Sequence, residues 1–278
     1  MHGFNIGRSF EFRNCGDTHG APCDTDSSAV VQLLIDAGAN VNAASEEGKT
    51  PFYIACLRGM ESTVMKMLEC GAKASGINGK KLPLTAACLS GCVSVVQLLL
   101  TNGANPNLQE ESNSDCRYLF SSLPQTSSDS KLIYPLLIAV RYGNSDMVTA
   151  LLNAGADVNA VNDDGENIVC FGIKNAIKDR DYLSTEQIRK RLSTVRLLLQ
   201  HGANVNVLMP DGSSALYLAV TALVEARGWP RLDYVIELLR LQVTYGADLH
   251  DSSCQLAGNV YRRPLNTLTL TTPAAGDY

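Results

Sequence analysis

The stretch Val95-Val96-Gln97-Leu98-Leu99-Leu100, followed by Gly103-Ala104-Asn105, decides the fold of this chain. Apolar residues three and four apart give a helix one apolar face, and glycine then ends that helix because it adopts the left-handed conformation freely. The same dipeptide closes six apolar runs, at Gly38-Ala39, Gly71-Ala72, Gly103-Ala104, Gly155-Ala156, Gly202-Ala203 and Gly246-Ala247. In all but the second run, Asn or Asp follows the dipeptide.

The spacing of these dipeptides indicates a repeated unit. The intervals between the glycines are 33, 32, 52, 47 and 44 residues, so two match one unit length and three contain an insertion. A period of this size is typical of a stack of identical supersecondary units, which binds other molecules with its surface.

A second signal follows each of the first three dipeptides and predicts another helix. It is found in residues 50–55, 82–87 and 134–139, each with proline as the second residue. Proline fits the first turn of a helix, where its missing N–H is not needed. Glycine at positions 59, 91 and 143 then ends this first helix, so each unit reads as helix, turn, helix.

The two motifs, in this order and phase, resemble the ankyrin-repeat family, whose unit carries Thr-Pro-Leu-His-x-Ala and Leu-Leu-x-x-Gly-Ala. The resemblance covers residues 26–250 and implies an all-α solenoid of helix-turn-helix units with hairpin loops, five full repeats and one half. The motif histidine is absent, and its positions hold Tyr53, Thr85, Leu137, Cys170 and Tyr217. The family's histidine-based bond network should therefore be weakened.

Both ends depart from a regular repeat. Residues 1–25 are expected to be an irregular segment or a degraded half repeat, and residues 251–278 an irregular or truncated tail. The run 263–268, with Pro264 and Leu265, looks like the opening of another unit, which suggests a piece of a longer protein. A weaker interpretation of the same run is the start of a SOCS box, the ubiquitin-ligase module that follows ankyrin arrays in one family.

Three insertions break the period. The first, residues 110–131, is acidic and serine-rich and predicts a surface loop, with a regulatory phosphorylation or partner-binding loop as the alternative. In the second, residues 174–191, Ser184 and Gln187 form a capping-box pattern for a helix running to about Gln200. Its basic run 189–191 is read as a solvated face, or as a contact for an acidic partner. In the third, residues 223–232, Trp229 is expected to pack at a corner between elongated helices.

Composition narrows the class of protein. The chain has 278 residues, of which 45% are hydrophobic and 18% charged, so it can bury a sizeable core. It has no run of about 18 apolar residues to span a membrane and no signal-peptide core. A net charge of −5 argues against nucleic acid as a partner. We predict a cytoplasmic location, with the nucleus as the alternative.

The sequence offers no catalytic constellation. Cys15, His19 and Cys23 are the nearest approach to a metal site, but one loose set is weak, and neither a metal nor a cofactor is predicted. The nine cysteines are scattered and odd in number, and four, at positions 56, 70, 88 and 170, fall where a repeat buries its residues. We interpret them as small hydrophobes rather than disulfides and predict a non-enzymatic protein.

The resemblance implies a concave groove lined by the first helices and the hairpin loops. The partner-binding residues that it implies are Ile54, Leu57, Arg58, Leu89, Ser90, Ile138, Arg141, Tyr142, Phe171 and Lys174, with Leu218 and Thr221 in the last unit. The hairpin tips add Glu46, Glu47, Lys49, Ile77, Asn78, Asp163, Asp164, Leu208 and Met209. The predicted function is an interaction scaffold for a partner protein, one that carries apolar and acidic residues. The alternative is an adaptor that recruits substrates to a ubiquitin ligase.

Overall fold

The computed structural model describes residues 25–46, 48–77, 81–111, 132–162, 164–177, 184–225 and 233–248. Their helices are α1 (Thr25–Asp36), α2 (Pro51–Leu57), α3 (Glu61–Glu69), α4 (Pro83–Ser90), α5 (Val93–Thr101), α7 (Pro135–Tyr142), α8 (Ser145–Asn153), α9 (Ile168–Ile177), α10 (Thr185–Gln200), α11 (Ala215–Glu225) and α12 (Asp233–Thr244). The expected all-α array is confirmed.

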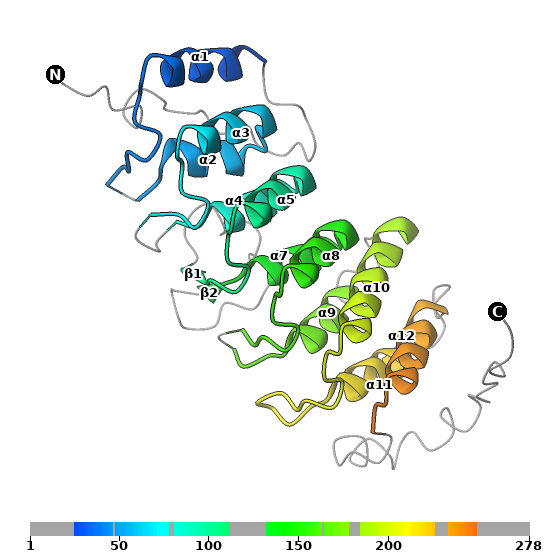
Figure 1. The fold of residues 1–278 in the computed structure, drawn as a ribbon. Helices are drawn as coiled ribbons and strands as arrows, with labels where there is room; N and C mark the ends of the chain where they lie inside the picture. The colour runs from blue at the N-terminus through cyan, green and yellow to red at the C-terminus, as the bar shows by residue number, and fades with distance from the viewer. Residues whose placement is uncertain are drawn as a thin grey trace, which may run out of the picture.

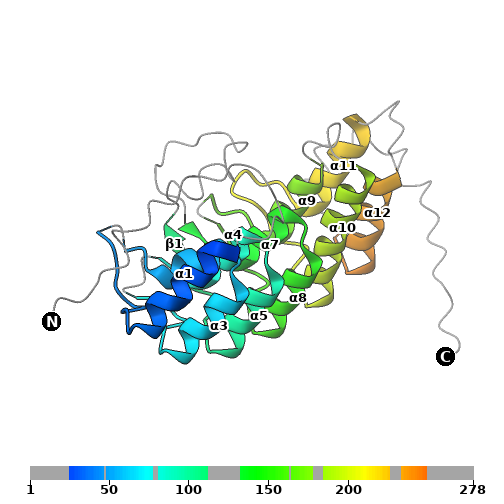
Figure 2. The same cartoon turned by 90° about the horizontal axis from the view of Figure 1, so that it is seen from above.

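The helices form an elongated stack that runs from α1 at one end to α12 at the other (Figure 1). The first helices of the pairs, α2, α4, α7, α9 and α11, contact one another in sequence order and form one layer. The second helices, α3, α5, α8, α10 and α12, continue the row begun by α1 and form the other layer (Figure 2). Each pair joins the next through a connection, which we name by the glycine that opens it.

The first helices start and stop where local chemistry requires. Pro51 opens α2, and the Thr50 hydroxyl accepts a hydrogen bond from the Tyr53 N–H at 3.0 Å, which satisfies a donor of the first turn. Gly91 ends α4 with φ +75°, a left-handed conformation that a side chain would disfavour.

The later pairs start with polar caps because they lack the proline. The Asn167 side chain accepts from the Val169 N–H at 2.8 Å at the start of α9. The capping box of α10 is confirmed, with the Ser184 hydroxyl bonded to the Gln187 N–H at 3.2 Å and the Gln187 side chain to the Ser184 N–H at 2.8 Å. The helix ends at Gln200 as predicted, and it has 16 residues against nine in α8.

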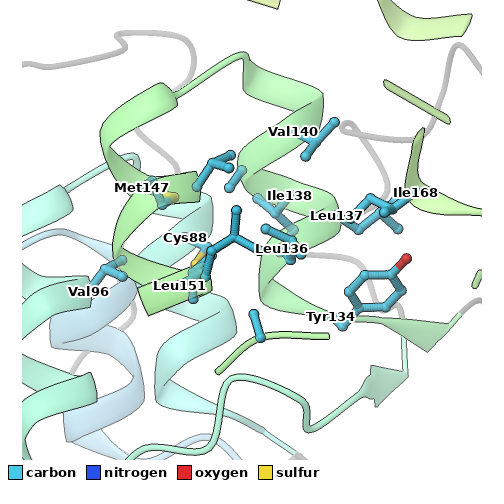
Figure 3. Packing of buried hydrophobic residues seen from close by; sticks show 14 of the residues in the cluster. Cys88, Val96, Tyr134, Leu136, Leu137, Ile138, Val140, Met147, Leu151 and Ile168 are labelled. Carbon is cyan, nitrogen blue, oxygen red and sulfur yellow. The ribbon is translucent and has the colours of Figure 1, made fainter. Parts of the chain in front are cut away.

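A continuous hydrophobic core fills the space between the layers. Figure 3 shows its middle, where Leu136 and Ile138 of α7 meet Leu151 of α8 and Val96 of α5. The cysteines at positions 56, 88 and 170 are buried as small hydrophobes, as predicted. The prediction for Cys70 is wrong: it follows the last residue of α3 and is exposed.

The first insertion begins and ends in a short β-ladder. Strand β1 (Glu110–Glu111) pairs antiparallel with β2 (Leu132–Ile133), with Glu110 opposite Ile133. The surface-loop prediction is therefore wrong at Glu110, whose side chain is only 1% exposed.

Several predictions fall outside the described residues: the two chain ends, the set Cys15, His19 and Cys23, the run 263–268, Trp229, and residues 112–131. Within the described part of the chain, no helix is long and apolar enough to cross a membrane. The same residues contain no group of three His, Cys, Asp or Glu side chains placed to hold a metal ion.

Candidate interaction surface

The last turns of three consecutive first helices lie side by side. Leu57 ends α2, Leu89 lies in the last turn of α4 and Tyr142 ends α7, and each is half-buried against the core. Arg58 and Ser90, half-buried as well, follow at the matching places. Since α4 contacts both α2 and α7, these side chains form one surface, which we call the inner surface.

Two of the predicted partner-binding residues do not lie on this surface. Ile138 is 1% exposed and Phe171 is 3% exposed, so both belong to the core. The reason is the number of neighbours: α7 packs against α4, α8 and α9, and residues 135–140 are all buried. Ile54, in contrast, is half-buried like the inner-surface residues.

The cations predicted to line the groove are engaged within the stack. Lys174 Nζ lies 2.6 Å from the Glu166 carboxylate. Arg141 donates to Asn175 Oδ1 at 3.4 Å, and Asn175 Nδ2 donates to the carbonyls of Val140 at 3.2 Å and Arg141 at 2.9 Å. Arg141 therefore helps to join two units. The idea that it can be removed without affecting the contact between repeats is wrong.

The connections carry exposed apolar residues beside the inner surface. Val161 and Leu208 are each 50% exposed, at equivalent places where their connections pair across an isolated β-bridge. Met209, predicted to lie at a hairpin tip, is instead buried, and its backbone N–H donates to the Ser213 carbonyl at 2.8 Å. Glu46 and Asp164 are exposed, Lys49 and Ile77 are half-buried, and residues 47, 78 and 163 lie outside the described residues.

Asparagine side chains clamp neighbouring connections together. Asn42 Nδ2 donates to the Gly71 carbonyl at 3.0 Å, and Asn42 Oδ1 accepts from the Lys73 N–H at 3.3 Å. The same pair of bonds joins Asn107 to Gly155 and Asp157, and Asn206 to Gly246 and Asp248, while Asn159 accepts from the Asn204 N–H. Our sequence reasoning missed these clamps. Their signal is an asparagine four residues after each of those glycines.

The Asn or Asp that follows each Gly-Ala has its own local role. The Asn40 side chain accepts from the backbone N–H of Asn42 at 2.9 Å, which fixes the turn that carries the clamp. The same turn recurs at Asn105, Asp157 and Asn204. The recurring tripeptide thus prepares the backbone for the asparagine two residues later.

A buried polar cluster surrounds Glu110, which our sequence reasoning also missed. Glu110 Oε2 accepts from the Leu82 N–H at 2.9 Å, and Oε1 lies 3.5 Å from Lys81 Nζ and 3.4 Å from the Tyr53 hydroxyl. Lys81 Nζ also lies 5.8 Å from the centre of the Tyr53 ring. Burial raises the pKa of Glu110 above 4.5, against the opposing effects of the Leu82 N–H, Lys81 and Tyr53.

Comparison with known proteins identifies the repeat. Residues 19–110 and 136–251 match the family described as ankyrin repeats (3 copies). The chain is 28% identical over 240 residues to B-cell lymphoma 3 protein homolog of Mus musculus, which spans 78% of this chain and 48% of that protein. It is 27% identical over 194 residues to Rabankyrin-5 of Homo sapiens, over 70% of this chain and 14% of that protein. The chain thus spans half the length or less of these curated relatives.

A solved structure shares the fold. An ankyrin repeat domain from Acinetobacter baumannii AYE superposes with a TM-score of 0.58 at 22% sequence identity, covering 80% of this chain and 94% of that one.

Proposed function

This chain belongs to the ankyrin-repeat family, and we propose that it is a non-enzymatic scaffold that binds a partner protein through the inner surface and the adjoining connections. The family is typically an interaction fold without catalytic activity, and stacks of this kind use extended surfaces for binding. The family resemblance alone does not say which residues contact the partner, so the choice of surface has to come from the exposure of the side chains.

One observation supports the inner surface above the others. Leu57, Leu89 and Tyr142 are large side chains that remain half-buried, although each sits on a first helix whose other apolar residues are mostly covered. Aromatic and arginine residues at the centre of a docking surface tend to dominate affinity, and Tyr142 lies beside two leucines. Because Lys174 and Arg141 are engaged by Glu166 and Asn175, the partner segment is expected to be mainly apolar.

A pair of charge substitutions tests this surface. In the double variant Leu57→Glu with Leu89→Glu, two carboxylates replace apolar side chains on neighbouring first helices, and their half-exposed positions let the charges reach water. The matched control is Leu68→Glu with Leu100→Glu, because these leucines are half-buried at equivalent places on the second helices α3 and α5.

Partners would be captured on the immobilised chain, identified by mass spectrometry, and measured as purified proteins by calorimetry. Losing two central apolar contacts should weaken binding by about 30-fold or more, equivalent to about 2 kcal/mol. The control variant should bind like the wild type, with circular dichroism confirming that both variants are folded. Equal binding by the inner-surface variant would remove this surface from consideration and favour the second-helix layer.

A further inference from the structure

One junction in the array lacks the asparagine clamp that joins the other connections. Four residues after Gly71 the chain has Ser75, and Lys73 takes the place of the Asn or Asp that prepares the turn. Ser75 is exposed, and its side chain makes no hydrogen bond among the described residues. The Gly71 connection is therefore not clamped to the Gly103 connection in the way that Asn42 and Asn107 clamp theirs.

The Glu110 side chain joins the same two connections. It lies in the Gly103 connection, whereas its partners Lys81 and Leu82 lie at the end of the Gly71 connection. Its third partner, Tyr53, belongs to α2, one unit further back. One carboxylate thus binds across the junction at which the amide clamp is missing.

We propose that Glu110 replaces the missing asparagine clamp and makes this junction a titratable joint in the array. The other clamps of the described residues use amide groups, which do not ionise. Glu110 ionises, and its bonds to the Leu82 N–H and to Lys81 change character when it gains or loses a proton. Its position at the root of β1 means that the joint also fixes how the insertion leaves the stack.

The direction of the pH effect follows from burial. The titratable groups that face the carboxyl are Lys81 Nζ and the Tyr53 hydroxyl, and the residue opposite it on β2 is the apolar Ile133. Because the pKa is raised above 4.5 in the folded chain, the folded chain holds this proton more tightly than the unfolded chain. The contribution of Glu110 to stability should therefore decrease as the pH rises above about 4.5 and through the raised pKa.

The first experiment compares unfolding of the wild type and Glu110→Gln from about pH 5 to about pH 8. Glutamine keeps an acceptor for the Leu82 N–H but does not titrate. The stability of the wild type relative to this variant should decrease with rising pH. Glu69→Gln, whose parent carboxylate is exposed, should run parallel to the wild type. A pH-independent difference between the wild type and Glu110→Gln would overturn the titratable joint.

The second experiment asks whether an asparagine can take over. Exchange of the Leu82 amide should accelerate about tenfold or more in Glu110→Ala, since that bond is made to a charged acceptor. Adding Ser75→Asn to this variant should restore most of the lost stability, because it recreates the clamp to the Gly103 turn. Ser75→Ala is its control and should restore nothing.

The combination of the two sites decides whether they do the same work. Ser75→Asn should stabilise the Glu110→Ala chain more than it stabilises the wild type, since in the wild type the junction is already held. An equal gain in both backgrounds would mean that Glu110 does not substitute for the clamp. If Glu110→Ala does not fold, the same comparison is made in the Glu110→Gln background.

Discussion

Replacing Gln242 with leucine should stabilise the last helix pair. Gln242 lies in α12 and is completely buried, yet neither Oε1 nor Nε2 has a hydrogen-bond partner among the described residues. Leu99, Leu151 and Leu198 hold the same place, four residues before the closing glycine of their units, and each is 0% exposed. The leucine in those units shows which side chain this position accommodates.

The size of the effect follows from the amide. A buried polar group without a partner costs about 1–3 kcal/mol, and leucine removes that cost while filling a similar volume. We therefore expect the free energy of unfolding of the last pair to rise by about 1–3 kcal/mol. For a chain of this size each kcal/mol corresponds to about 2–4 °C in Tm.

The assay has to report on the last pair, because repeat arrays do not always unfold as one unit. Native-state hydrogen exchange of the α11 and α12 amides would be followed together with urea unfolding. Gln97→Leu is the control, since Gln97 is exposed on α5 and its replacement should change stability by no more than about 0.5 kcal/mol. An unchanged or lower stability for Gln242→Leu would refute the reasoning, since it would mean that the amide is satisfied in solution.

Three further outcomes are expected. Leu99→Ala should lower the free energy of unfolding by about 2–5 kcal/mol in urea denaturation, whereas Leu108→Ala, at a side chain 38% exposed in a connection, should cost far less. Asn107→Ala should cost about 1–2 kcal/mol and speed the exchange of the Asp157 amide, which donates to it at 2.7 Å. In site-resolved labelling at about pH 8, a thiol reagent should modify the exposed Cys70 well before Cys56, because burial raises the pKa of the Cys56 thiol and shields it.

The array itself was predictable because its signals are local. Pro83 can open a helix and Gly91 can end one regardless of what lies elsewhere in the chain, and the structure places both in those roles. The capping box at Ser184 is equally local and was predicted to the residue. Such features depend on a few neighbouring backbone groups, which the sequence states directly.

The inner surface was only partly predictable because exposure depends on neighbouring units. Ile138 and Leu57 both lie on first helices, but only the latter remains accessible, since α7 is enclosed by three other helices. Arg141 looked like a free cation until Asn175, from the next unit, was placed beside it. In both cases the deciding residues are distant in sequence, and no local pattern names them.

Glu110 shows how an irregularity in a repeat protein can be explained by a second one. Alone, a glutamate followed by another acid and several serines predicts a solvent-exposed loop, and its burial looks costly. The missing asparagine at Ser75 supplies the reason, because the two connections that should have been clamped there still need a bond between them. Each unit in a stack contacts only its neighbours, so a lost contact at one junction has to be replaced at that same junction. A departure from the repeat is therefore best interpreted together with departures in the adjacent unit.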